Sequence, residues 1–148
     1  MDRTTGFGVY LDRTLKKIQS AYLKAFETHG IDLTIEQWVI LQRIYLLGTE
    51  ASQSAVVKTN YRNRATTSRV ISGLCSKGLV IKERFQGDQK QYRLTLTAKG
   101  QATITRAEPI IKELRLIATK NIKEEDFDIF LNVLNRLWEN YHDTVELT

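Results

Sequence analysis

The stretch that decides the fold runs from Ser52 to Gly100 and reads SQSAVVKTNYRNRATTSRVISGLCSKGLVIKERFQGDQKQYRLTLTAKG. Its patterning predicts a short helix, a longer helix, and then two extended runs joined by a polar turn that contains Gly and Asp. This order is the outline of a winged helix-turn-helix, in which a helix can enter the DNA major groove and the hairpin can reach the backbone or minor groove. The elements are expected at 53–59, 64–77, 79–85 and 91–96, with the turn at 86–90.

Positive charge is concentrated in the same stretch. Between Lys58 and Arg93 there are nine Lys or Arg residues and two acidic ones, a local balance of +7, whereas all 148 residues together carry +5. The rest of the chain is therefore net negative. The second helix contains no acidic residue, although a solvated helix usually carries both signs. The pattern predicts a surface that binds phosphates.

The second helix has two different faces. Thr67, Ile71 and Leu74 lie at helical spacing and are predicted to pack inward, together with Val70. Arg64 and Arg69 could each make a bidentate contact to guanine, or could position phosphates or face solvent. The outward face is small, hydroxylated and basic, with Ala65, Ser68, Arg69, Ser72 and Ser76.

Amphipathic helices flank this stretch on both sides. A helix over 9–29 should end at Gly30, and a capping box of Thr34 and Gln37 should begin a second helix that Gly48 ends. That second helix is apolar almost all round, which predicts burial on several sides. Thr97 should cap a long helix that Pro109 bends, and a last helix over 124–141 should begin with acidic residues.

The apolar stripes of the first helix and the last two exceed what a compact winged helix needs. The simplest partner for them is a second copy of the chain, which would place two recognition helices in successive major grooves. The residues expected at this dimer interface are Leu11, Leu15, Phe130, Leu134, Leu137 and Trp138.

The sequence thus predicts a mainly α fold with a small β-hairpin wing, as one domain over 1–148. Within it, 7–32 and 101–148 form a helical dimerisation region and 33–100 form the winged helix-turn-helix. The single Cys excludes an internal disulfide, and no Cys/His set has zinc-ligand spacing. No Gly-rich phosphate loop, nucleophile elbow or carboxylate pair indicates an enzyme, a cofactor or a metal. Without a signal-peptide core or a membrane-length apolar run, we expect the protein in the bacterial cytoplasm, on the nucleoid when bound to DNA.

Four motifs occur in a characteristic order. They are Leu33-Thr34-x-x-Gln37-Trp38-x-x-Leu41, Gly73-Leu74-x-x-Lys77-Gly78-Leu79-Val80, Asp88-x-Lys90, and Leu94-Thr95-Leu96-Thr97-x-x-Gly100. Their order and spacing resemble the MarR family of bacterial transcription regulators over nearly the whole chain. The resemblance implies a dimeric regulator that binds a pseudo-palindromic operator. We interpret the chain as a homodimer that represses or modulates transcription by binding double-stranded DNA. The resemblance also implies that a small aromatic or phenolic ligand, or oxidation of a thiol, weakens DNA binding.

The resemblance places the recognition-helix contacts from Asn63 to Arg69 and the wing motif at 88–90, where Lys90 stands in place of the family's usual Arg. Lysine suits a narrow minor groove less well, so Arg84 or Arg93 could substitute, or the wing could contact mainly phosphates. The preceding basic turn, from Asn60, could extend the surface. The predicted DNA contacts are Asn63, Arg64, Thr66, Ser68, Arg69 and Ser72 in the helix, and Arg84, Asp88, Lys90 and Arg93 in the wing.

Three further interpretations stay open in the sequence. Cys75 is either a small packed residue or a redox sensor favoured as thiolate by Lys77, although the peroxide-sensing members that the resemblance implies carry the reactive Cys in the first helix. The winged helix could alternatively be a protein-interaction module whose basic face docks an acidic protein. A ligand pocket, or simply an aromatic core, is expected from Tyr10, Tyr22, Phe26, Trp38 and Tyr45.

Overall fold

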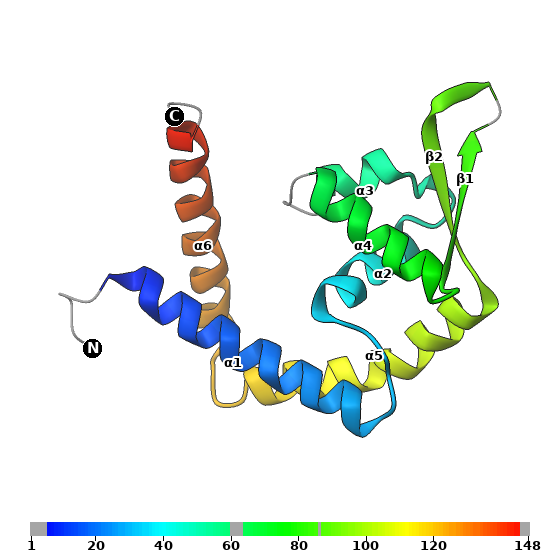
Figure 1. The fold of residues 1–148 in the computed structure, drawn as a ribbon. Coiled ribbons are helices and arrows are strands. Elements are labelled where there is room, and N and C mark those ends of the chain that lie inside the picture. The colour runs from blue at the N-terminus through cyan, green and yellow to red at the C-terminus, as the bar shows by residue number, and fades with distance from the viewer. Residues whose placement is uncertain (1–5, 60–63, 86, 146–148) are drawn as a thin grey trace. The chain divides into compact units, whose positions relative to one another are not determined.

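The computed structural model describes residues 6–59, 64–85 and 87–145, with the side chains of 88–90 and 142–145 excepted. The described chain is mainly helical with one two-stranded antiparallel hairpin, as predicted. It divides into two compact units, Met1–Ile111 and Lys112–Thr148. In chain order the elements are α1 (Phe7–Thr28), α2 (Ile35–Leu47), the 3-10 turn η1 (Gly48–Glu50), α3 (Gln53–Thr59), α4 (Arg64–Ser76), β1 (Val80–Phe85), β2 (Asp88–Leu96), α5 (Ala98–Ala118) and α6 (Glu124–Val145) (Figure 1).

Local side-chain caps start three of the helices where the sequence predicts them. At α2, Thr34 Oγ1 accepts a hydrogen bond from the backbone N–H of Gln37, and Gln37 Oε1 accepts one from the N–H of Thr34, both at 3.1 Å. The hydroxyls of Ser52 and Thr97 accept bonds from N–H groups three residues later, at 3.1 and 2.9 Å. These caps satisfy donors that the first helical turn leaves free. Asn63, the cap predicted for α4, lies outside the described residues.

The core of the first unit is built around α2 and α4. The inward face of α4 is confirmed, since Thr67, Ile71 and Leu74 are fully buried. The predicted burial of α2 on several sides is confirmed, because it packs against α1, α3, α4 and β2, although Val39 is 41% and Leu46 67% exposed. Neighbouring elements cover only part of α2, so its remaining face is open to solvent. The buried apolar residues of α2 are Trp38, Ile40, Leu41 and Ile44.

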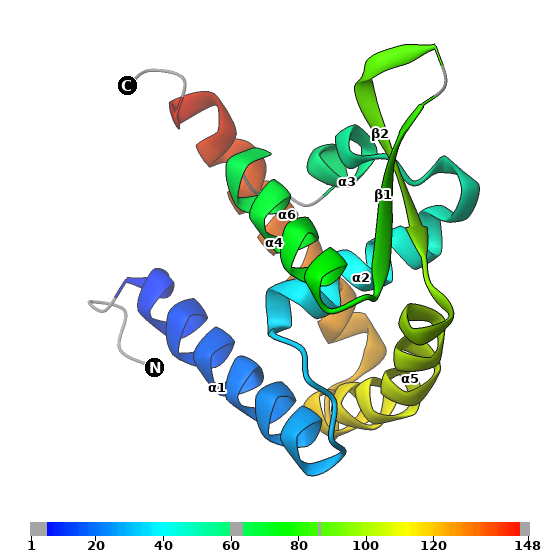
Figure 2. The ribbon, with the colours of Figure 1, turned by 45° about the vertical axis from the view of Figure 1, so that its right-hand side comes forward.

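The hairpin forms the wing (Figure 2). Its strands pair antiparallel, with Val80 opposite Leu96 and Arg84 opposite Tyr92, and a register shift follows Arg84. Pairing resumes at Asp88, so the predicted turn over 86–90 is too long, because its last three residues belong to β2. Burial alternates along β2, because Leu94 is buried and its neighbours Arg93 and Thr95 are exposed.

Close backbone packing anchors the base of the wing to the start of α5. Thr97 Oγ1 donates a hydrogen bond to the Gly78 carbonyl at 2.6 Å, and the Thr97 N–H donates one to the Leu79 carbonyl at 3.1 Å. Gly100 is buried beside this contact, and a Cβ atom there would lie 2.1 Å from Leu79 O. At the other edge, the Leu94 N–H donates to the Ala51 carbonyl at 3.0 Å. The wing is therefore fixed at its base on both strands.

Apolar side chains on α1 and α6 remain uncovered in the single chain. In α1 only Phe26 is buried, while Leu15 is 54% exposed. The second unit contains the end of α5 and α6, on which Phe130 and Trp138 are 46% and 54% exposed. The three predicted acidic residues occupy the first turn of α6. Among the described residues, none of the helices is long and apolar enough to cross a membrane. The bend at Pro109, within α5, stays a prediction.

Candidate nucleic-acid interface

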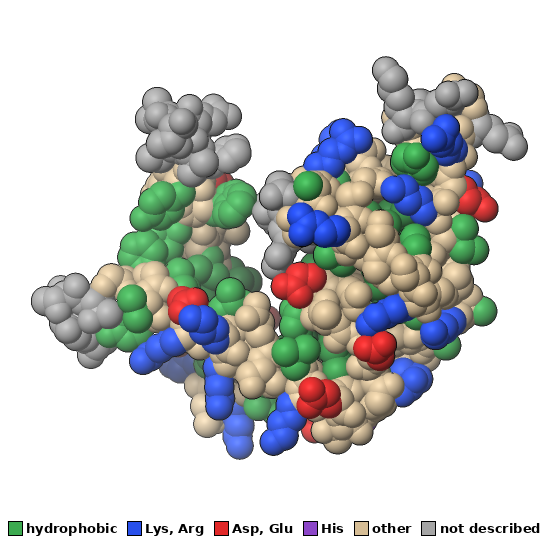
Figure 3. All heavy atoms as spheres, viewed as in Figure 1, with side chains coloured by type: hydrophobic (Ala, Val, Ile, Leu, Met, Phe, Trp, Pro, Cys, Tyr) green, Lys and Arg blue, Asp and Glu red, His purple; other side chains and the backbone are tan. Residues whose placement is uncertain are grey.

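The solvent-facing side of α4 carries the cations that the sequence singles out. Arg64, Arg69 and Ser72 are exposed, and Ser68 and Thr66 are half-buried. Ser72 Oγ donates to the carbonyl of Ser68 at 3.0 Å, so this hydroxyl is partly satisfied within the helix. Figure 3 shows Lys and Arg side chains spread over the winged helix. The two arginines are thus free to reach a polyanion, because neither is packed into the core.

The wing places its two predicted arginines on opposite faces. The inner face of the wing is the one that carries the buried Leu94, and Arg84 lies on it with Lys82 and Tyr92. Arg93 lies on the opposite, outer face, paired with Glu83. Both arginines nevertheless line one surface hollow of about 830 Å³, together with Glu83 and Phe85. The predicted contacts Asp88 and Lys90 have side chains outside the described part, and Asn63 lies outside it altogether.

An aromatic ring organises the inner face of the wing. Lys82 Nζ lies 4.2 Å from the centroid of the Tyr92 ring, and Arg84 Cζ lies 5.8 Å from it. Both distances fall within the range of cation–π attraction. Neither Tyr92 nor Lys82 is among the DNA contacts predicted from the sequence. Strand alternation was the available signal, since it puts Lys82, Arg84 and Tyr92 on one face.

The same ring borders a cavity of about 210 Å³. The cavity lies where α3, the start of α4 and β2 meet, and Lys58 and Arg64 contribute two cations to it. Among the described residues that line it, none is acidic. The basic surface thus continues from the wing to the start of α4. The residues that line it are Gln53, Ser54, Val57, Lys58, Arg64, Gln91 and Tyr92.

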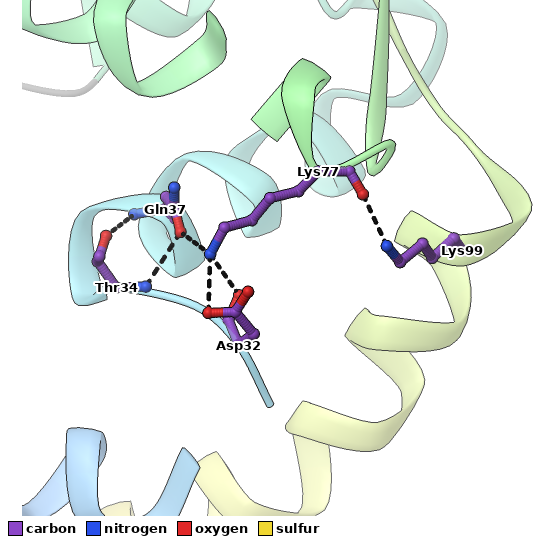
Figure 4. Close-up of polar contacts among 5 residues, drawn as sticks. All are labelled: Asp32, Thr34, Gln37, Lys77 and Lys99. Carbon is purple, nitrogen blue, oxygen red and sulfur yellow. Dashed lines mark hydrogen bonds and ion pairs between the residues drawn. The ribbon is translucent and has the colours of Figure 1, made fainter. Parts of the chain in front are cut away.

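Lys77 fixes the carboxyl end of α4 to the segment between α1 and α2 (Figure 4). Its Nζ donates to the Asp32 carbonyl at 2.8 Å and to Gln37 Oε1 at 3.1 Å, and it lies 3.0 Å from Asp32 Oδ1. Lys99 Nζ, at the start of α5, donates to the Lys77 carbonyl at 2.7 Å. Cations here also suit the negative end of the α4 dipole. The position and tilt of α4 therefore depend on both neighbouring segments.

The aromatic residues expected at a ligand pocket fall in three places. Tyr22, Phe26 and Trp38 pack edge to face, with ring centroids 6.4 and 6.1 Å apart. Phe26 and Trp38 are 1% and 2% exposed, so these two belong to the core. Tyr45 borders a separate cavity of about 380 Å³ with Arg93 and Gln101 among its lining residues. Tyr10 lies near the start of α1, with the Arg13 guanidinium 4.7 Å from its ring.

Cys75 is half-buried near the end of α4. Burial raises the pKa of its thiol above the ordinary value, and the nearby charge of Lys82 lowers that pKa by a smaller amount. The sequence named Lys77 as the favouring cation, which is wrong, because the Lys77 ammonium is engaged by Asp32 and Gln37. The neutral thiol is therefore favoured. Within the described residues, no group of three or more His, Cys, Asp or Glu could hold a metal ion.

We expect Cys75 to be alkylated slowly in the folded protein. Because its pKa is raised, the thiolate fraction at pH 8 is smaller than for an exposed thiol, and the thiolate is the reactive form. Iodoacetamide labelling followed by mass spectrometry should show a rate that climbs between pH 8 and 10 and that is lower than in urea-unfolded protein. Labelling at pH 7 as fast as in the unfolded chain would instead indicate an activated thiol, and would favour Cys75 as a sensor.

Comparison with known proteins finds a family match in the winged-helix part of the chain. The model of the MarR family matches residues 33–92, from the loop before α2 into β2. Several of the solved structures that the chain matches are described as transcriptional regulators.

Three solved structures show that the MarR architecture extends beyond this segment. A MarR transcriptional regulator from Methanosarcina mazei Go1 is 23% identical, with 93% of this chain and 97% of that chain covered and a TM-score of 0.73. MepR from S. aureus, in complex with DNA, is 18% identical over 92% and 98%, with a TM-score of 0.84. BpsR of Bordetella bronchiseptica, whose DNA binding is regulated by 6-hydroxynicotinic acid, is 20% identical over 93% and 96%, with a TM-score of 0.79. The expected fold is therefore confirmed.

Proposed function

We propose that this protein is a transcriptional regulator that binds double-stranded DNA through α4 and the inner face of the wing. The observation that carries the proposal is the acid-free outward face of α4, on which Arg64 and Arg69 are exposed. The Lys82 and Arg84 cations on the inner face of the wing add to it. A helix of this kind fits the major groove, and the cations replace counterions along the phosphates. The complex of MepR with DNA supports the same role for this architecture.

The proposed active form is a homodimer on a pseudo-palindromic operator. The apolar faces of α1 and α6, which include Leu11, Leu15, Phe130 and Trp138, are exposed in the single chain and would be covered by a second copy. Leu134 and Leu137, half-buried on α6, would extend that interface. A two-fold dimer would present its two α4 helices to major grooves about 34 Å apart.

Regulation is proposed to be steric and ligand-dependent. The dimer would cover a promoter and repress it, and a small aromatic or phenolic effector would change the distance between the two α4 helices. Because both half-sites need the same spacing, a small shift would weaken both contacts together. The control of BpsR by 6-hydroxynicotinic acid supports an effector of this class. The protein would act in the bacterial cytoplasm, on the nucleoid.

The test is a binding selection from random duplex DNA with the purified protein at two salt concentrations. We expect an inverted repeat whose half-sites are about one helical turn apart, with an affinity that falls steeply as salt rises. Selected duplex should co-migrate with two protein chains in sedimentation analysis. Binding without any recovered motif, lost as salt rises, would overturn sequence-specific regulation and favour a basic surface that docks an acidic protein.

A further inference from the structure

The inner face of the wing holds two cations over one aromatic ring. In the strand register, Tyr92 lies directly opposite Arg84 and diagonally from Lys82, whose own partner is Leu94. The Lys82 ammonium is 4.2 Å and the Arg84 guanidinium carbon 5.8 Å from the ring centroid. Lys82 and Tyr92 are half-buried, while Arg84 is exposed. The ring therefore holds both long side chains without removing them from the surface.

The two faces of the wing differ in charge. On the outer face, Glu83 stands directly opposite Arg93, so the two charges offset each other. On the inner face, no acidic residue of the described pairs faces Lys82 and Arg84. Lys82 also lies close enough to the end of α4 for its charge to lower the pKa of Cys75. The uncompensated cations are thus on the side of the wing that faces α4.

We propose that Tyr92 is a positioning residue of the DNA interface, which holds Lys82 and Arg84 on the α4 side of the wing for contact with phosphates beside the groove that α4 enters. This inference rests on the proposed function. Lys and Arg side chains lose much conformational freedom when a contact orders them. Cations that a ring already holds lose less on binding, so the same phosphate contacts give tighter binding.

The cavity at the start of α4 supports this role. Tyr92 borders it together with Lys58 and Arg64. One ring therefore lies between two pairs of cations, one on β1 and one on α3 and α4. A continuous basic track of this kind can follow a duplex backbone from the wing to the recognition helix. Tyr92 joins the two parts of the track.

The first test needs no DNA and measures the ring contact itself. In the wild type, the side-chain protons of Lys82 next to Nζ should be shifted upfield in the NMR spectrum by the Tyr92 ring current. Tyr92→Phe should keep this shift and Tyr92→Leu should remove it. Phe85→Leu is the matched control, because Phe85 is an aromatic residue on the same hairpin, at the opposite end of β1 from its anchored base, and it should keep the shift. A wild-type Lys82 without an upfield shift would overturn the inference.

The second test measures affinity for the selected duplex. We expect Tyr92→Leu to weaken binding by on the order of tenfold, the effect of releasing two cations, one half-buried and one exposed, from a ring. Tyr92→Phe and Phe85→Leu should bind within about twofold of the wild type. Lys82→Gln should lower the salt slope by about 0.9, because one phosphate contact is lost.

A double-mutant cycle separates positioning from a general structural role. Lys82→Gln should weaken binding at least about threefold less in the Tyr92→Leu background than in the wild type. In the Tyr92→Leu background no ring holds the Lys82 cation, so removing the cation costs less. If the wild type binds DNA and Lys82→Gln weakens binding equally in both backgrounds, the inference about Tyr92 is overturned while the proposed function stands. A wild type that binds no duplex would overturn the proposed function and, with it, the role of Tyr92 at DNA.

Discussion

Replacement of Gly100 by alanine should destabilise the protein by about 3 kcal/mol, the upper part of the range for overpacking. A Cβ atom at this position would lie 2.1 Å from the Leu79 carbonyl oxygen and 3.3 Å from Leu96 Cδ2. The obstacle is backbone, so no side-chain rotation relieves it. The Leu79 carbonyl also accepts the hydrogen bond of the Thr97 N–H, so moving it breaks the junction between the wing and α5.

Thermal unfolding checks this expectation. A loss of about 3 kcal/mol corresponds to roughly 6–12 °C in Tm for a chain of this size. Gly8→Ala is the matched control, since Gly8 is also helical and nothing lies within 4 Å of the Cβ position. That variant should be unchanged or stabilised by up to about 1 kcal/mol. Equal Tm values for the two variants would contradict the close approach of α5 to the base of the wing.

Arg69→Ala should produce the largest loss of DNA binding from a single side chain. Arg69 is exposed on the outward face of α4. An arginine that contacts a base by two hydrogen bonds contributes about 1–3 kcal/mol of discrimination, or roughly 5- to 150-fold in affinity. Equilibrium binding to the selected duplex and to variants with one changed base pair measures this loss and shows at which base pair specificity relaxes.

Lys24→Ala controls for the loss of one positive charge. Lys24 is exposed on α1, away from α4 in the sequence and outside the winged helix. It should leave both affinity and specificity close to those of the wild type. If Arg69→Ala weakens all duplexes equally and lowers the salt slope by about 0.9, Arg69 contacts a phosphate. If it binds like Lys24→Ala, α4 is not the reading helix.

Local chemistry explains what the sequence could predict. The caps of α2, α3 and α5 depend on residues three positions apart, such as Thr34 and Gln37. The inward face of α4 follows from helical spacing alone, and Thr67 is fully buried as expected. Interactions within one turn or one strand leave a readable pattern because the spacing is fixed by the backbone.

Contacts between distant segments leave no such pattern. The exposure of Val39 and Leu46 on α2 depends on which neighbours cover that helix, and an apolar stripe does not show this. The turn of the wing is shorter than predicted because pairing resumes after an irregularity beyond Arg84. Core and pocket aromatics also look alike in sequence, and only packing shows that Phe26 and Trp38 belong to the core.

The attachment of Lys77 has a consequence for exchanging DNA specificity between regulators. The carboxyl end of α4 is held by an ammonium that reaches Asp32 and Gln37, which are 45 and 40 positions away in the chain. If α4 were transplanted into another scaffold, it would therefore lose this attachment unless the acceptors Asp32 and Gln37 were transplanted with it. The helix that we propose to read DNA and the residues that orient it thus lie in separate parts of the sequence.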